Sequence, residues 1–509
     1  MLEHNWSGGY VVDIDYTHGY YRELSPSLLR FAALLGSRAV DAEAPFTYYE
    51  LGCGQGFSTV LHAAANPAGR FFGVDFNPSH IQNAELLARE AGAGNVRFLE
   101  RSFGELLEGE AEEADFIVLH GVWSWIGAEH RQQVLEFMRR RLKPGGIAYV
   151  SYNCLPGVAQ VAPLQRLLNE HAGLGAGERM EKVRRAMAFA GQLRDAGARF
   201  FTDSPLAVAR LADMGRHDPN YLAHEYFNAN WTPFFHADVA RDLSGAKLAY
   251  AASAALMDNF EPLVVKPEVA KLMAALGDSL MAETVKDFAR NQAFRRDVFA
   301  RGAGHAGPAE LEAALGRTRF ALARPRNRCR LRGAALSGEV TLDEAIHAPL
   351  LDALGRSPMS FAELARSPEA GKLGSARLRQ AVFTAAAFGN VQPALPASGE
   401  EARRAGAAKF NRALLARPVS GFGNLVLASP VLGAGVSVDF IDRLMLEAPR
   451  DEQKALAHAR GAMASRGIRM FKSEKPLEGA GEVEAALAER AGRFFQENLP
   501  YYRQLGVAD

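Results

Sequence analysis

The chain has 509 residues, more than one hydrophobic core usually holds, so we expect several domains. Lys plus Arg and Asp plus Glu both count 58, and this balance argues against a general nucleic-acid binder. The three cysteines, Cys53, Cys154 and Cys329, lie too far apart in the sequence for a metal site or a disulfide framework. We therefore expect no metal, no nucleic-acid partner and a reducing compartment.

Targeting and membrane segments are not expected either. The N-terminus lacks the basic region and apolar core of a secretion signal. No apolar run reaches the roughly 18 residues of a membrane span. The nearest case, 421–440, is interrupted by Gly, Pro and Ser, and we interpret it as strands and turns. These features predict a cytoplasmic protein without a membrane span.

The N-terminal third alternates between strand-like and helix-like segments. An aromatic leader, "GGYVVDIDYTHGYYRELSP", is followed by a predicted helix over 26–35. Predicted strands then alternate with helices, and the strands cover 46–52, 70–76, 95–103, 114–121 and 147–153. Such alternation predicts an α/β fold of Rossmann-like type, a parallel sheet with helices on both faces.

After this unit the chain becomes largely helical. Segment 348–394 has the order helix, turn, helix, helix, strand, which suits a winged-helix module, and its few basic residues favour protein docking over DNA binding. Seven arginines in 317–333 predict either a surface for an acidic partner or a solvated strand face. We predict four domains: a catalytic domain with its leader, a helical regulatory or substrate domain, a winged-helix-like domain and a C-terminal domain, at 1–165, 166–315, 316–400 and 401–509.

The first chemical motif is the glycine turn in "YYELGCGQGFSTVL". Gly52, Gly54 and Gly56 follow Glu50, but Phe57 stands where a dinucleotide fingerprint needs a small residue. A carboxylate at Glu50 suits a ligand ammonium better than a diphosphate. S-adenosylmethionine has an ammonium and a carboxylate but no phosphate, and the helix N-terminus after the turn can receive its carboxylate. We therefore predict S-adenosylmethionine as the cofactor.

The next strands offer further cofactor contacts. Asp75 ends the second strand 19 residues after Gly56, well placed to bond both ribose hydroxyls, and Phe76 follows it. Ser102 and Phe103, at the end of the third strand, are candidates for the edge and face of the adenine. The alternative, a glycine-rich connection without a ligand, is disfavoured by this agreement of motif and context.

"ELGCGQG", "GVDF", "ADFIVLHG" and "LKPGG" resemble the motifs of class I S-adenosylmethionine-dependent methyltransferases. "LHGVWSWI", "GIAYVSYNCLPG" and "DPNYLAHEYFN" further resemble the multi-domain family with a methyltransferase regulatory domain, which includes the rickettsial outer-membrane-protein lysine methyltransferases. The resemblance implies N-methylation of lysine side chains in a protein substrate, with S-adenosyl-L-homocysteine as product. Alternatives are a small-molecule acceptor and a cofactor-binding scaffold protein with little catalysis.

Candidate acceptor-side residues follow strands four and five. His120 can take a proton or bond the cofactor, or it is a satisfied histidine at a strand end. Trp123 and Trp125 can both line the acceptor pocket only in an extended loop, and core packing is their alternative. Tyr152, near the end of strand five, is a candidate for the same cleft, and strand-end packing is its alternative.

Two other segments carry candidates. Tyr16 and Tyr21, in the leader, are candidates to contact the cofactor or the acceptor, unless the leader is only a packed cap. His224 lies in the aromatic-rich stretch 213–253 and is expected to border the substrate cleft. One His/Glu pair at His224 and Glu225, without a third ligand, does not predict a metal.

Overall fold

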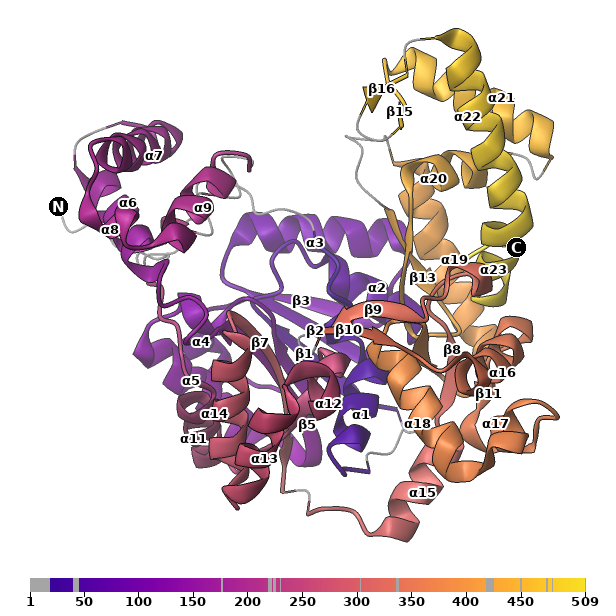
Figure 1. Ribbon diagram of the computed structural model, residues 1–509, viewed down its shortest axis with the longest axis horizontal. Helices are drawn as coiled ribbons and strands as arrows, with labels where there is room; N and C mark the ends of the chain where they lie inside the picture. Colours follow the sequence, from indigo (N-terminus) through magenta and orange to yellow (C-terminus); the bar gives the residue numbers. More distant parts are fainter. Residues whose placement is uncertain are drawn as a thin grey trace.

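The computed structural model describes residues 19–39, 45–174, 177–217, 222, 226–228, 230–302, 304–335, 338–417, 425–448, 451–472, 475–477 and 479–508. At its centre is a seven-stranded sheet in the order β3-β2-β1-β4-β5-β7-β6 (Figure 1). Strands β1 to β5 pair in parallel, and β7 lies antiparallel between β5 and β6. The strands are β1 (Thr47–Leu51), β2 (Arg70–Asp75), β3 (Val96–Glu100), β4 (Ala114–Leu119), β5 (Leu142–Asn153), β6 (Leu248–Ser253) and β7 (Phe294–Arg301). The predicted Rossmann-like α/β sheet is confirmed.

Helices cover both faces of this sheet, because successive side chains on a strand point to opposite faces. Tyr48 and Tyr49 are adjacent on β1 and are both buried, yet they belong to two different apolar clusters. Helices of the first face are α1 (Pro26–Leu35), α2 (Phe57–Ala65) and α3 (Pro78–Ala91). Those of the second face are α4 (Phe103–Glu108), α5 (Ala128–Arg141) and α11 (His236–Gly245).

The last two strands of the sheet come late in the chain. After β5 the chain forms a helical lobe with its own apolar core and then returns through α11 to β6 and β7. The lobe comprises α6 (Ala162–Gly173), α7 (Arg179–Asp195), α8 (Arg199–Thr202) and α9 (Pro205–Met214). Segment 166–315, expected as a helical domain, therefore also completes the sheet.

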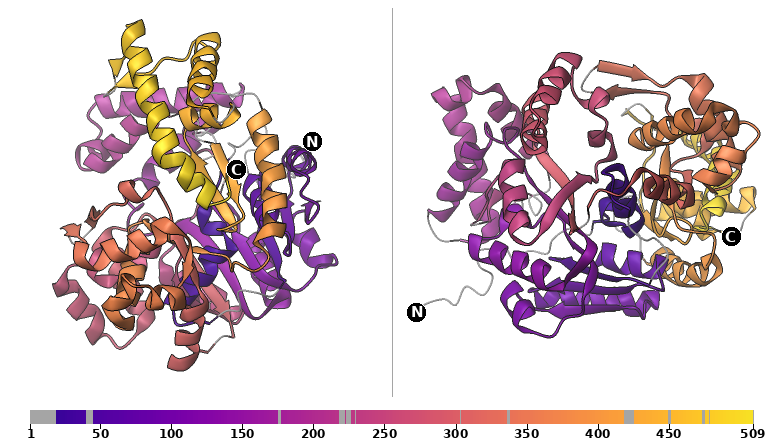
Figure 2. Two further views of the ribbon diagram at one scale, coloured as in Figure 1. Left: turned by 90° about the vertical axis from the view of Figure 1, so that its right-hand side faces the viewer. Right: turned by 90° about the horizontal axis from the view of Figure 1, so that it is seen from below.

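The C-terminal segments pack on the first face through α1. Phe31 of α1 makes edge contacts with Phe320 and Phe383, at 5.4 and 5.8 Å between ring centroids. In Figure 1 and in the right view of Figure 2, this part and the lobe lie at opposite ends of the molecule. Its helices include α15 (Pro308–Arg317), α16 (Glu344–Arg356), α17 (Phe361–Arg366), α18 (Gly374–Ala387), α19 (Glu400–Ala416), α20 (Phe440–Glu447), α21 (Glu452–Ser465), α22 (Ala480–Arg493) and α23 (Leu499–Gln504).

The expected winged helix is not confirmed. The order α16, β11 (Met359–Ser360), α17, α18, β12 (Val391–Ala394) agrees with the predicted helix and strand order. However, the middle strand of the small sheet is β8 (Arg319–Leu322), which precedes these helices in the chain. Arg328 ends a short 3-10 turn, and a strand begins only at Arg332, so the arginines from 328 to 332 do not form the predicted strand.

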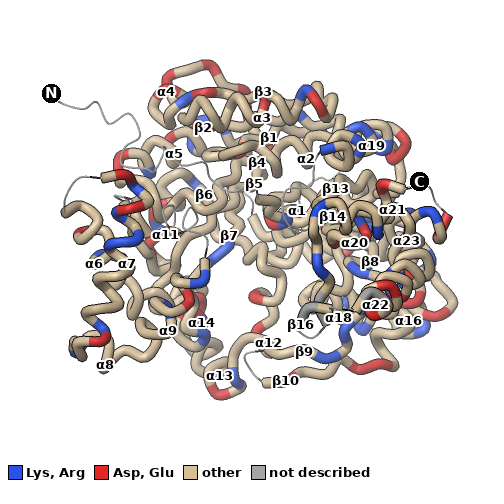
Figure 3. Tube along the Cα trace, turned by 90° about the horizontal axis from the view of Figure 1, so that it is seen from above, with Lys and Arg blue, Asp and Glu red and all other residues tan. Residues whose placement is uncertain are grey.

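Other sequence expectations agree with the structure. Strands β13 (Leu425–Ser429) and β14 (Ala434–Val438) form an antiparallel hairpin in the Gly-rich stretch, as expected for strands and turns. Within the described ranges, no helix is both long and apolar enough to cross a membrane. Figure 3 shows acidic and basic residues interspersed along the chain.

A buried ionic network fixes the antiparallel end of the sheet. Arg295 of β7 is 4% exposed and bonds Asp297 on its own strand at 2.9 Å. It also bonds Asp287 at 2.6 Å and Glu283 at 2.8 Å, and both lie on α14 (Ser279–Arg290). Asp297 in turn bonds His236 of α11 at 2.9 Å. The guanidinium of Arg295 therefore ties α14 to β7 directly, and α11 to β7 through Asp297.

Removing this guanidinium should destabilise the protein strongly. Arg295→Ala leaves three carboxylates near one another without their main counter-charge, so we expect the free energy of unfolding to fall by about 3–5 kcal/mol. Urea unfolding followed by circular dichroism measures the change. Arg326→Ala is the control, since it breaks an exposed pair with Asp352 and should cost less than about 0.5 kcal/mol. Equal effects of the two variants would contradict the assigned role of the network.

Candidate functional site

The glycine turn after β1 has a conformation that favours glycine at three positions. Gly52, Gly54 and Gly56 have φ angles of 72°, 52° and 68°, in the left-handed region that other residues rarely adopt. The amides of Gly52 and Cys53 both donate to the carbonyl of Val74, at 2.8 and 3.0 Å. The turn is thereby folded back over the end of β2.

The three glycines have different surroundings. A Cβ added at Gly52 would lie 2.6 Å from Val122, and one at Gly56 would lie 2.5 Å from Ala84, so both positions are filled by packing. A Cβ at Gly54 would meet nothing within 4 Å. The backbone at Gly54 therefore borders open space, where a ligand can approach it closely.

Helix α2 begins directly after the turn and presents free amides. Its N-cap is Gly56, which offers no side-chain cap to the first turn of the helix. The amide groups at such an end carry a partial positive charge and suit a carboxylate. Phe57, which departs from the dinucleotide pattern, directs its ring toward Phe410 of α19, at 6.0 Å between centroids. This large side chain thus packs between helices.

Asp75 links the turn to the end of β2. Its Oδ2 accepts a hydrogen bond from the amide of Gly54 at 2.9 Å, and its Oδ1 accepts one from the amide of Asn77 at 2.9 Å. His80 Nδ1 lies 3.3 Å from the same Oδ1. Each carboxylate oxygen has two acceptor positions, so the carboxylate can hold the turn and still accept from a ligand hydroxyl.

Glu50 is buried beneath the turn. Its Oε2 accepts a hydrogen bond from Thr59 of α2 at 2.6 Å. The pKa of Glu50 is raised to about 7, chiefly by burial and also by the nearby Asp75, while the Thr59 hydrogen bond opposes these effects. A carboxyl in this condition becomes fully ionised when a cationic ligand group arrives beside it.

The end of the leader, residues 19–25, lies beside the start of α2 and the end of β4. The amide of Tyr21 donates to Ser58 Oγ at 3.2 Å, and Ser58 Oγ donates to the carbonyl of Gly19 at 3.3 Å. The ring of Tyr21 stacks on His120, with 3.9 Å between centroids and 29° between planes. The structure therefore brings together Tyr21 and His120, which are 99 residues apart in the sequence.

His120 is held as a neutral ring. Its Nδ1 lies 2.8 Å from the hydroxyl of Tyr149 on β5. The pKa of His120 is lowered to about 3, chiefly by burial and also by the positive charge of Arg296. A ring with so low a pKa is a poor proton acceptor at neutral pH, so His120 is better suited to packing and hydrogen bonding than to general-base catalysis.

The third strand is followed by a helix cap. Ser102 and Glu105 form a capping box at the start of α4, in which the Ser102 amide and hydroxyl both bond Glu105 Oε2 at 2.8 Å. These bonds explain Ser102 without a ligand. Phe103 is partly buried against the second apolar cluster, and Phe76 is half-exposed directly after Asp75. Their predicted contacts with the cofactor remain proposals.

The two tryptophans after β4 diverge, as expected for a helical rather than an extended segment. Trp123 lies in the apolar core and is fully buried. Trp125 stacks on Trp231, with 6.0 Å between ring centroids and 26° between planes. Trp231 Nε1 also donates to Asn153 Oδ1 at 2.9 Å, at the end of β5. The sequence pattern does not single out Trp231, which lies within the aromatic-rich stretch 213–253.

Tyr152 faces away from His120. Its hydroxyl donates to Asp297 at 2.6 Å within the buried network of Arg295, and it is 1% exposed. The strand alternates, so Tyr149 and Ser151 face the residues after β4, bonding His120 and the Gly121 amide respectively. Tyr152 is therefore part of the buried network, as in the alternative of strand-end packing, and does not face His120. Tyr16 and His224 lie outside the described residues.

Comparison with known proteins agrees with this geometry. Residues 45–191 match a family described as a methyltransferase domain, and residues 218–301 match one described as a predicted methyltransferase regulatory domain. The uncharacterized protein sll1526 of Synechocystis sp. is 35% identical over 504 residues, covering 99% of this chain and 100% of that protein. The chain belongs to the methyltransferases with a regulatory domain. The cofactor of this methyltransferase is S-adenosylmethionine.

Other relatives share part or all of the architecture. The uncharacterized protein RP789 of Rickettsia prowazekii is 26% identical to the methyltransferase over 277 residues, covering 53% of this chain and 48% of that one. The structure of PKMT2 from Rickettsia typhi, in complex with AdoHcy, superimposes with a TM-score of 0.71 at 18% identity. The likeness covers 97% of this chain and 99% of that one and shows a common fold.

A methyl group at Gly54 should block the cofactor. Gly54→Ala puts a Cβ into the open space beside the turn and strains a backbone with φ of 52°. We expect the affinity of the methyltransferase for S-adenosylmethionine, measured by calorimetry, to fall at least about tenfold, or about 1.4 kcal/mol. Gly94→Ala is the control, because a Cβ there also meets nothing within 4 Å and the φ of Gly94 is not positive. Unchanged affinity in Gly54→Ala would refute this placement of the cofactor.

Glu50 should make cofactor binding depend on pH. A carboxyl with a pKa of about 7 is protonated below that pH, and a cationic ligand favours its ionised form, so binding releases a proton and tightens as pH rises. The ratio of wild-type to Glu50→Gln affinity should rise about tenfold from pH 6 to pH 8. Using this ratio cancels the titration of the ligand itself. The exposed Glu129→Gln serves as control, and a flat ratio would show that Glu50 does not face the cationic part.

Proposed function

We propose that this methyltransferase N-methylates lysine side chains of a protein substrate. The observation that carries the proposal is the group of aromatic side chains at the ends of β4 and β5. Tyr21 covers His120 there, and the Trp125–Trp231 pair lies beside Asn153 on the adjoining loop. The resemblance of the sequence motifs to the rickettsial lysine methyltransferases supports the same acceptor.

The surroundings of His120 favour an uncharged amine. Burial and the charge of Arg296 disfavour a positive charge on His120, and the same effects lower the pKa of a lysine placed beside it. Bound S-adenosylmethionine supplies a methyl group on a cationic sulfonium. The acceptor nitrogen must therefore lose its proton to solvent before it forms the new N–C bond, since His120 is a weak base. The methylated nitrogen then carries the positive charge, which aromatic rings stabilise.

The helical lobe supplies a surface for a large substrate. Leu174, Phe189 and Leu206 are large apolar side chains of α6–α9 and their connections that remain exposed, at 70%, 36% and 49%. Further exposed apolar side chains, Leu272, Leu276, Met281 and Phe288, lie on α14 and on or beside the helix 267–275 that precedes it. Exposed apolar side chains on both segments offer contacts to a protein substrate. In this proposal the sheet domain transfers the methyl group, while the lobe and the C-terminal part recognise the substrate. The free thiols of Cys53, Cys154 and Cys329 agree with a cytoplasmic location.

The proposal predicts label in protein lysine. The purified enzyme, incubated with methyl-labelled S-adenosylmethionine and cell extract, should label protein bands, and peptide mapping should place the label on lysine. Trp231→Ala should reduce this transfer about tenfold or more, with unchanged affinity for the cofactor, because it removes the ring stacked on Trp125. Trp231→Phe keeps a ring and should retain most of the activity. Label found only in small molecules would refute the proposal.

A further inference from the structure

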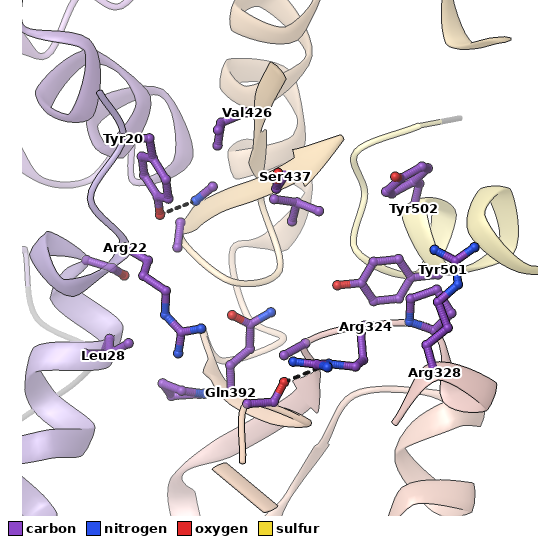
Figure 4. Close-up of a pocket in the computed structure, with 18 of the residues that line it drawn as sticks. Tyr20, Arg22, Leu28, Arg324, Arg328, Gln392, Val426, Ser437, Tyr501 and Tyr502 are labelled. Atoms are coloured by element: carbon purple, nitrogen blue, oxygen red, sulfur yellow. Dashed lines mark hydrogen bonds between the residues drawn. The ribbon is translucent and has the colours of Figure 1, made fainter. Parts of the chain in front are cut away.

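A cavity lies away from the glycine turn, between the end of the leader and the C-terminal segments. It has a volume of about 750 Å³, a size that suits a small organic ligand. Its walls come from the end of the leader and the start of α1, the connection after β8, Gly389 and β12, the hairpin β13–β14, the start of α20, and residues 498–502 (Figure 4). These segments are distant in the sequence, so the cavity exists only in the assembled chain.

The acidic residues of the cavity are already engaged. Glu23 pairs with Arg296 at 3.6 Å, and Asp439 pairs with Arg490 at 3.4 Å. Asp442 accepts hydrogen bonds from Tyr502 and Asn498, both at 2.7 Å. The negative charges that line the cavity therefore have donors of their own.

Three arginines of the cavity have no ion pair with a carboxylate among the described residues. In the part of the chain that the structure describes, Arg22, Arg324 and Arg330 have no carboxylate within 4.0 Å, whereas the fourth lining arginine, Arg328, pairs with Glu497 at 3.5 Å. Burial lowers the pKa of Arg324, and the positive charge of Arg330 lowers it further. The cavity thus holds positive charge that the described side chains do not neutralise.

Uncharged donors accompany these arginines. Figure 4 shows Arg22, Arg324 and the hydroxyl of Tyr501 pointing toward the centre of the cavity, with the amide of Gln392 near them. Burial raises the pKa of Tyr501, so its phenol stays protonated and can donate a hydrogen bond. Guanidinium groups and neutral hydroxyl and amide donors together match an oxyanion, which Arg binds through two parallel hydrogen bonds.

We propose that this cavity is a binding site for a small organic anion that carries a phosphate or carboxylate group. Arg324 and Arg22 bind the oxyanion from opposite walls, and Tyr501 donates a further hydrogen bond. The cavity volume leaves room for more than a single inorganic ion. This site does not depend on which acceptor the enzyme methylates.

The leader connects this site with the cofactor site. Tyr20 accepts a hydrogen bond from the Gly435 amide of β14 at 2.6 Å and lines the cavity, whereas the next residue, Tyr21, stacks on His120. Arg22 follows directly. An anion that holds Arg22 therefore stabilises the leader where it lies beside the start of α2 and the end of β4. We infer that the ordered leader favours cofactor binding, and reciprocal linkage then makes the anion and the cofactor tighten each other's binding by the same factor.

Calorimetry on the full chain tests the site with pyrophosphate, adenosine monophosphate and citrate as probes. We expect at least one probe to bind one site per chain, and Arg324→Ala and Arg22→Ala each to weaken it at least tenfold. Tyr501→Phe, which keeps the ring, should weaken it severalfold. Arg332→Ala is the matched control, an exposed arginine of the same segment outside the cavity, and should bind as wild type.

The outcomes discriminate clearly. Phosphate probes that bind while citrate does not would identify a phosphate ligand, and the reverse a carboxylate ligand. Failure of all probes, or equal loss in Arg332→Ala, would overturn the site. Binding of an acidic poly-glutamate peptide in place of every small probe would also overturn it and favour a protein partner. S-adenosylmethionine affinity measured with saturating probe should rise, and an unchanged value would refute the link through the leader.

Discussion

The burial of α1 on all sides is the constraint on which the arrangement of the domains depends. Leu29, Phe31 and Ala32 are at most 1% exposed, and the helix packs between the sheet and the C-terminal segments. Polar side chains of this helix contact the segments on either side of it. Ser27 Oγ donates to the Leu432 carbonyl at 2.9 Å, and the Arg30 guanidinium lies 4.9 Å from the Phe46 ring centre. The sheet domain and the C-terminal part therefore share one core.

This shared core also fixes the path of the leader, which ends where α1 begins. In the described part of the leader, Tyr20 bonds the β13–β14 hairpin, and the next residue, Tyr21, stacks on His120. The close fit of the leader is visible at Gly435, where an added Cβ would lie 2.7 Å from Tyr20 Cζ. Because Tyr20 and Tyr21 are adjacent in the chain, a displacement of the hairpin that moves Tyr20 also moves the residue stacked on His120.

Much of the fold and of the cofactor turn follows from local sequence pattern, whereas the acceptor side does not. Strands β1 to β5 have apolar runs and turn signals, and the glycines of the turn need a backbone that few other residues adopt. Tyr152 was misplaced because both faces of the sheet are covered, so hydrophobic pattern does not tell which face a strand residue takes. Trp231 meets Trp125 only through long-range packing.

The charges of the site explain why a cationic cofactor and a neutral acceptor suit it together. Burial raises the pKa of Glu50 and lowers that of His120, so the ligand-free site disfavours charge at both positions. A cationic ligand beside Glu50 and Asp75 restores the ionised form of Glu50, and this gain is available only to a ligand with positive charge. Methyl transfer removes the charge of the sulfonium but leaves the ammonium of the cofactor in place. The contact that we predict between Glu50 and this ammonium therefore holds the product S-adenosylhomocysteine as well as the substrate.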